Sequence, residues 1–252
     1  MLVLLPPSET KRDGGDVEPL VLHALAYRTF DAQRSTALAA IADLAGDPEA
    51  MMRALKLGPR QASEVDRNRA LATAPTMPAM DRYTGVLYDA LDSPSLAAEA
   101  RAYASRHLVI HSALFGLLGA ADPIPAYRLS HDSRLPGLRL RALWREPVSS
   151  VLAAHDGLIV DLRSEGYAEL GPAPRRPDSV FLRVVSVDES GRRRALNHFN
   201  KRAKGLFTRA LLESRPELET RADLLDWAAT SGFRLDLGAT RPSAPDELEL
   251  VA

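Results

Sequence analysis

Cysteine is absent from the 252 residues of this chain. Its absence excludes a disulfide scaffold, a thiolate metal site and a cysteine nucleophile. The sequence also lacks an apolar run of the length that a membrane span needs. The opening segment has no basic residue, and its apolar run stops at Pro6, which is too short for a signal peptide. We therefore expect a cytoplasmic protein that does not bind a membrane.

Neither sign of charge is in excess, because 32 Lys and Arg residues face 33 Asp and Glu residues. This balance excludes a polycation, so any affinity for nucleic acid must come from a local basic patch. Lysine itself is scarce beside arginine. This bias indicates a GC-rich genome more than a function, and a lysine kept in such a chain is only a hint of a position that suits a compact, titratable amine. The lysines are Lys11, Lys56, Lys201 and Lys204.

The pattern of apolar residues predicts one mixed α/β domain. Strands are expected at 2–5, from 107 onward, and at 157–163, 180–187, 193–199 and 233–237. Helices are expected within 17–71 and at 95–106, 200–213 and 224–229. The turn from Asp188 to Gly191 indicates a hairpin, so part of the sheet should be antiparallel. Residues 32–80 are interpreted as a helical insertion, and the tail from Gly238 onward as loose.

The segment Leu57-Gly58-Pro59 has the form of a tight turn between two helices, with Lys56 and Arg60 beside it. Such a turn points backbone N–H groups and a helix N-terminus at a phosphate. The alternative is an ordinary corner, since Gly followed by Pro commonly ends one helix and starts another.

A second basic segment runs from Arg192 to Arg209. Lys201 and Lys204 are three residues apart on a predicted helix and share a face, nearly in line with Arg209. Such a face suits a DNA backbone, although a merely solvated face is the alternative. The full set comprises Arg192, Arg193, Arg194, His198, Lys201, Arg202, Lys204 and Arg209.

Polar residues gather at the predicted strand ends, where α/β proteins place ligand sites. We expect a pocket for a nucleobase or nucleotide there. Its candidate residues are Ser8, Lys11, Tyr83, Thr84, Ser112, Asp161, Arg163, Ser164, Tyr167, His198 and Lys201. In the alternative interpretation, Asp161, Arg163 and Tyr167 form a structural network of ion pairs and hydrogen bonds.

Lysine also offers covalent chemistry. Ser8 and Lys11 have the spacing of a serine nucleophile with a lysine base on a helix, but the neighbouring prolines and glycines argue against a helix there. Lys201 or Lys204 in a basic cleft fits better with an amine that attacks the carbonyl of an abasic site or a nucleobase.

Histidine is the remaining metal-ligating residue type. His107 and His111 have the helical spacing of a metal pair, but the apolar residues between them indicate a strand, which would set the imidazoles roughly 13 Å apart. The other candidates are His131, His155 and His198, and none of them has a second ligand at a spacing typical of a metal site. We expect no bound metal or cofactor, and only an indirect effect on iron.

Several blocks of the sequence, in their order, resemble the YaaA family of bacterial peroxide-stress proteins. The blocks are 4–11 (LLPPSETK), 83–85 (YTG), 111–118 (HSALFGLL) followed by 123–129, 162–168 (LRSEGYA) and 198–205 (HFNKRAKG). The resemblance implies a mixed α/β fold with a positively charged cleft and a helix-hairpin-helix element. It also implies duplex DNA binding and a role in lowering free iron during peroxide stress.

On this basis the first hypothesis is a DNA-binding stress protein. Its phosphate contacts would come from Lys56, Gly58, Arg60, Lys201, Arg202, Lys204 and Arg209. The second hypothesis is an enzyme that acts on a nucleobase, a nucleoside or damaged DNA, with Lys201 and Lys11 as catalytic candidates. A bare metal-binding protein is the third.

Overall fold

The computed structural model describes residues 1–187, 193–195, 198–240 and 244–251. Its main sheet has the strand order β4-β3-β1-β6-β7-β10-β9, and β8 pairs with β7. These strands are β1 (Leu2–Leu5), β3 (Leu108–Ser112), β4 (Gly116–Gly119), β6 (Ile159–Asp161), β7 (Ser179–Val187), β8 (Arg193–Ala195), β9 (Arg234–Leu237) and β10 (Asp246–Val251). A small antiparallel sheet pairs β2 (Met77–Pro78) with β5 (Pro123–Ile124). The predicted mixed α/β class is confirmed.

The centre of the main sheet is parallel. Strand β1 pairs in parallel with β3 on one side and β6 on the other, and β6, β7 and β10 continue in the same direction. The run Leu2–Leu5 is buried throughout, as expected for a parallel strand covered on both faces. Strands β7 and β8 are antiparallel, which confirms the predicted hairpin pairing.

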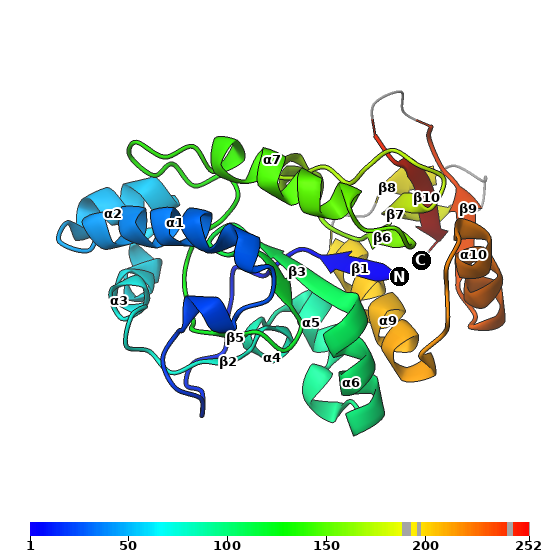
Figure 1. Ribbon diagram of the computed structural model, residues 1–252, viewed down its shortest axis with the longest axis horizontal. Coiled ribbons are helices and arrows are strands. Elements are labelled where there is room, and N and C mark those ends of the chain that lie inside the picture. Colours follow the sequence, from blue (N-terminus) through cyan, green and yellow to red (C-terminus); the bar gives the residue numbers. More distant parts are fainter. Residues whose placement is uncertain (188–192, 196–197, 241–243, 252) are drawn as a thin grey trace.

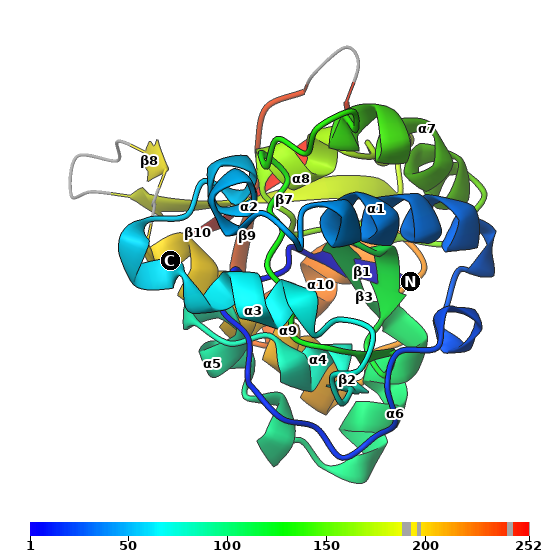
Figure 2. The same ribbon diagram turned by 90° about the vertical axis from the view of Figure 1, so that its left-hand side faces the viewer.

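Helices cover both faces of the sheet. Figure 1 shows α7 on one side and α5, α6 and α9 on the other, with α1, α2 and α3 grouped at one end of the molecule. This end faces the viewer in Figure 2. The helices are α1 (Asp31–Asp43), α2 (Pro48–Leu55), α3 (Ser63–Arg69), α4 (Ala79–Arg82), α5 (Val86–Leu91), α6 (Ala98–His107), α7 (Leu140–Ala153), α8 (Glu165–Glu169), α9 (His198–Ser214) and α10 (Arg221–Thr230). In the described part of the chain, none has the length and hydrophobicity that crossing a membrane would require.

Helix α9 approaches α5 closely because Gly205 has no side chain. A Cβ atom at this position would overlap the carbonyl oxygen of Leu87 on α5. Any larger residue would therefore push the two helices apart. This contact fixes the start of α9 next to the loop that follows β1.

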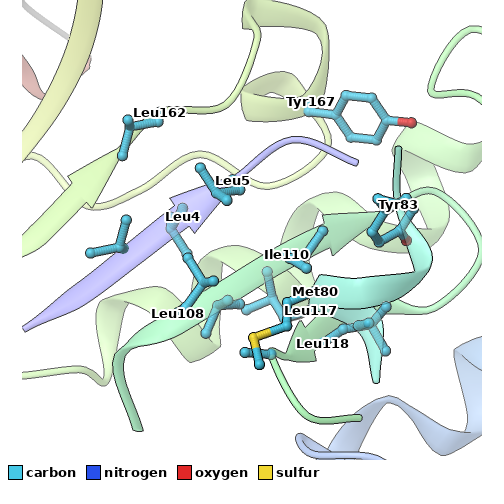
Figure 3. Close-up of a cluster of buried hydrophobic side chains, with 14 of the residues drawn as sticks. Leu4, Leu5, Met80, Tyr83, Leu108, Ile110, Leu117, Leu118, Leu162 and Tyr167 are labelled. Carbon is cyan, nitrogen blue, oxygen red and sulfur yellow. The ribbon is translucent and has the colours of Figure 1, made fainter. Parts of the chain in front are cut away.

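The apolar core extends along the central strands to their carboxyl ends. Figure 3 shows Leu4 and Leu5 of β1 packed beside Ile110 of β3, with Tyr83 and Tyr167 beyond the tips of these strands. All of these side chains are buried. The apolar core thus ends in a layer of tyrosines at the carboxyl edge of the sheet.

Three expectations from the sequence are corrected. The tail from Gly238 is not loose, because it returns as β10 between β7 and β9, with Leu248 and Leu250 buried. The first α-helix begins at Asp31 rather than near Val17. Helix α7 was not predicted, because Pro147 lies inside it and interrupts the helical pattern.

Candidate functional site

The order of the strands creates a crevice at one edge of the sheet. The chain passes from β1 to β3 on one side and later continues through β6 on the other side of β1. In open α/β sheets, ligands bind at the carboxyl ends of strands where the order reverses in this way. This point lies between β1 and β6, so the loops that follow these two strands are placed to form a ligand site.

A cavity of about 230 Å³ lies at this point. The loop after β1 and the start of α8 form two of its walls, and the beginning of α9 forms a third. Its lining residues are Pro6, Pro7, Ser8, Glu9, Leu87, Ser130, His131, Ser164, Tyr167, Asn200, Lys201 and Lys204. We call it the switch-point cavity.

Further hollows adjoin the sheet. One of about 290 Å³ lies across the Pro6–Glu9 loop and shares Lys201 with the switch-point cavity. A larger one, about 590 Å³, is bordered by Asp161 and Glu247, but these carboxylates already pair with Arg163 and Arg183. Because these carboxylates are already paired, the switch-point cavity is the better candidate for a functional site.

Lys204 brings a buried amine to the switch-point cavity. Its side chain is 5% exposed, and its Nζ donates to the carbonyl oxygens of Leu162, at 2.9 Å, and Arg163, at 3.3 Å. Burial lowers the pKa of this amine to about 8, although the nearby Asp161 opposes the shift. An amine with this pKa is partly neutral near physiological pH.

Lys11 lies below the loop rather than in the cavity. Its Nζ donates to the backbone oxygens of Ser8 and Glu9 and lies 4.1 Å from the centre of the Tyr127 ring. Because Lys11 reaches the carbonyl of Ser8 and not its hydroxyl, the two residues do not form a nucleophile and base pair. Lys11 instead holds the loop that forms the cavity wall.

A chain of hydroxyl groups supports the same region from below. The Tyr127 hydroxyl lies 2.7 Å from the Tyr83 hydroxyl and 2.6 Å from Ser112 Oγ. Ser112 Oγ also accepts hydrogen bonds from the backbone N–H groups of Leu114 and Phe115. Burial raises the pKa of Tyr127 to about 12, so its hydroxyl stays protonated. Tyr83 and Ser112 thus build the floor of the site and do not line the cavity.

Burial of the Lys11 amine predicts a pH-dependent stability. Desolvation, followed by the charge of Arg128, lowers the pKa of Lys11 from 10.5 to about 7. The folded protein therefore binds this proton less tightly than the unfolded chain does. The cost of burying Lys11 is complete below about pH 7 and fades as the pH rises toward 10.5.

We expect the stability of Lys11→Met relative to the unaltered protein to fall between pH 7 and pH 9, by up to about 1.4 kcal/mol per pH unit. Urea unfolding at each pH measures this difference. The exposed Lys201→Met is the control and should show no such slope. A difference in stability between Lys11→Met and the unaltered protein that stays constant across this pH range would contradict the account.

Asp161 and Arg163 form a buried ion pair behind the cavity. Arg163 donates through Nε and Nη2 to the two Asp161 oxygens, at 2.8 and 2.6 Å, and both side chains are almost fully buried. Arg163 Nη1 donates to Nδ1 of His111, whose pKa is held well below its ordinary value by burial and by the Arg163 charge. Asp161 and Arg163 match the structural network that the sequence left as an alternative, but the third member of that network is His111, whereas Tyr167 lines the cavity.

The structure brings some predicted pocket residues together and separates others. Ser8, Ser164, Tyr167 and Lys201 line the switch-point cavity. Thr84 does not line the cavity. Its carbonyl accepts from Thr10 Oγ1 at 3.2 Å, and its N–H donates to the Thr10 carbonyl at 3.1 Å. The side chain of His198 lies outside the described residues.

Other residues that line the cavity were not predicted. They are Glu9, Ser130, His131 and Asn200. The Tyr167 hydroxyl interacts with the Ser130 side chain and the His131 backbone, and Gly166 leaves room for the His131 ring. The loop that carries Ser130 and His131 does not follow a long strand. The expectation that ligand residues gather at strand ends could therefore not identify it.

The two basic segments flank the switch-point cavity. Lys56 pairs with Asp132 at 2.6 Å, next to His131 on the cavity wall, and Arg60 is exposed close by in the sequence. At the start of α9, Lys201 lines the cavity, and Lys201 and Arg202 are both exposed.

Four members of the predicted phosphate-binding set are already engaged, and Lys56 is one of them through its ion pair with Asp132. The Gly58 N–H donates to Gln61 Oε1 at 3.1 Å. Arg209 pairs with Glu213 at 2.8 Å and with Asp92 at 3.5 Å. Lys204 is buried, so it does not share an exposed face with Lys201 as the helical spacing predicted.

The histidines do not converge. His107 ends α6, while His111 lies in β3, so the expectation that both belong to one strand is corrected. His107 Nδ1 lies 2.9 Å from the backbone oxygen of Met1. Across the residues that the structure describes, no group of three His, Asp or Glu side chains is placed to hold a metal ion.

Comparison of the sequence with known proteins identifies a family. The family model described as peroxide stress protein YaaA matches residues 1–237. The chain belongs to this family. Its membership supports a role in peroxide stress.

Relatives in the family cover the chain from end to end. A UPF0246 protein of Corynebacterium glutamicum strain R is 41% identical over 256 residues, which span 100% of both chains. A UPF0246 protein of Streptomyces coelicolor is 40% identical over 243 residues, or 95% of this chain and 93% of the relative. The family model stops at residue 237, so β10 lies beyond its match although it belongs to the main sheet.

Proposed function

We propose that this protein binds duplex DNA across the switch-point cavity and protects it during peroxide stress in the cytoplasm. The observation that supports the proposal is that exposed lysines of both basic segments lie near the same cavity. Lys201 lines it, and Lys56 pairs with Asp132, the neighbour in sequence of the lining residue His131. Lys56 and Arg60 would contact the DNA backbone on one side, and Lys201 and Arg202 on the other.

The turn at Gly58 supports this proposal as a helix-hairpin-helix-like element. It lies between α2 and α3, and the 3₁₀ helix Pro59–Gln61 follows it directly. A phosphate at this turn would replace the Gln61 oxygen as the acceptor for the Gly58 N–H. Lys204 stays outside the proposed interface because it is buried. Arg209 stays outside because it pairs with two carboxylates and its side chain is only 24% exposed, whereas Lys56 has one ion pair and is 45% exposed.

Protection from iron follows from the same proposal. Hydroxyl radicals form where Fe²⁺ meets peroxide, so a protein that covers the DNA would shield the backbone without binding the metal. Strand breaks made by Fe²⁺ and peroxide in vitro should therefore fall as the duplex becomes occupied by protein.

Replacing Lys201 with Ala is expected to weaken duplex binding, because it removes an exposed phosphate contact beside the cavity. Fluorescence anisotropy with a labelled duplex at low salt measures the affinity. Arg106→Ala is the matched control, since Arg106 is equally charged and exposed but lies on α6, which leads into the opposite end of β3. Equal affinities for the two variants, or no binding by the unaltered protein at low salt, would refute the proposal.

A further inference from the structure

Lys204 lines the switch-point cavity, but its amine takes no part in the proposed phosphate contacts. Helix α9 sets its position, because Gly205 lets the helix approach Leu87 of α5 and Leu87 itself lines the cavity. Lys204 thereby reaches the loop after β6 from beneath. The amine is buried, yet it borders a cavity between two exposed basic segments.

The hydrogen bonds of Lys204 favour a nucleophilic amine. A neutral amine has two N–H groups and one lone pair, and the Leu162 and Arg163 carbonyl oxygens are acceptors for both N–H groups. The lone pair then remains for an electrophile in the cavity. The lowered pKa of about 8 supplies this neutral form near physiological pH.

The other lysines are placed differently. Lys11 is enclosed beneath the loop against the Tyr127 ring, and Lys201 is exposed at the cavity mouth. Lys56 is engaged with Asp132 outside the cavity. Lys204 thus combines burial with access to the cavity.

The size and lining of the cavity limit which electrophiles can bind in it. Its 230 Å³ is below the range of about 300–1,000 Å³ typical of drug-sized ligands, so it suits a single sugar or base. The lining offers hydroxyls from Ser8, Ser130 and Ser164 and the amide of Asn200. Within the described part of the chain, Asn200 Oδ1 is buried without a hydrogen-bond partner. These groups suit the hydroxyls of a sugar better than an apolar ring.

We propose that Lys204 forms an imine with the ring-opened sugar of an abasic site in the bound DNA. This inference rests on the proposed DNA binding. An abasic deoxyribose carries a free aldehyde, whereas the carbonyls of intact bases are amide-like and much less electrophilic. The Nζ lone pair bonds to the aldehyde carbon, the two Nζ protons pass to the former carbonyl oxygen, which leaves as water, and a C=N bond remains.

Borohydride reduction tests this step, because it converts the imine into a stable secondary amine. The unaltered protein is incubated at pH 8 with a duplex that contains one abasic site and is then reduced and digested. Peptide mapping then locates the adduct among the four lysines and the amino terminus. We expect it on Lys204, and we expect Lys204→Met to lose it.

The free sugar 2-deoxyribose 5-phosphate, with the same reductant, separates this inference from DNA binding. Labelling of Lys204 by the free sugar without duplex affinity would sink the proposed function but support the reactive amine. Duplex affinity without an adduct, or an adduct on Lys201, Lys11 or the amino terminus, would overturn the assignment to Lys204. Because the mapping uses the unaltered protein, the test does not depend on the folding of the Lys204→Met variant.

Discussion

Replacing Asp161 with Ala is expected to lower the free energy of unfolding by about 3–5 kcal/mol. The substitution would leave the Arg163 guanidinium fully buried without its counterion, since both side chains of this pair are at most 3% exposed. His111, which contacts Arg163 Nη1, cannot supply the lost negative charge, because an imidazole is either neutral or positively charged. Urea unfolding monitored by tryptophan fluorescence measures the loss.

Asp66→Ala is the matched control for this prediction. Asp66 also pairs with an arginine, Arg69 at 3.1 Å, but the carboxylate is 75% exposed. Exposed pairs contribute about 0–1 kcal/mol, so this variant should unfold almost as the unaltered protein does. Similar losses for the two variants would show that the Asp161 pair is not a buried structural link.

Replacing Leu248 with Ala is expected to cost about 2–5 kcal/mol, because it leaves a cavity in the core of the sheet. Leu248 is fully buried in β10, between β7 and β9. Its partner across the β9 pairing, Leu237, is 71% exposed and supplies the control. Leu237→Ala should change the stability by no more than about 0.5 kcal/mol. A small loss for Leu248→Ala would contradict the placement of the tail in the sheet.

Much of the fold was predictable, because local patterns report local structure. The buried run Leu2–Leu5, the pairing of β7 with β8 and helix α9 all follow from periodicity and turn residues. Strand β10 was missed although Leu248 and Leu250 alternate with acidic residues. Glu247 is buried there because it pairs with Arg183 at 3.0 Å, a partner 64 residues away that no local pattern reveals.

The candidate site was predictable only in part, for a related reason. The strand-end rule gathered Ser8, Ser164 and Tyr167, which the structure places around one cavity. Helical spacing put Lys204 on the same face as Lys201, but spacing does not show what covers a face. The loop after β6 covers Lys204 and supplies the carbonyl oxygens that bind its amine.

The central claim is that DNA crosses the switch-point cavity and contacts both basic segments. The most direct measurement is the dependence of duplex affinity on salt concentration for the unaltered protein, Lys56→Ala, Lys201→Ala and the double variant. Each phosphate contact that is lost should reduce the slope of log K against log salt by about 1, and the double variant by about 2. Unchanged slopes in both single variants would contradict the account and place any DNA contact elsewhere on the protein.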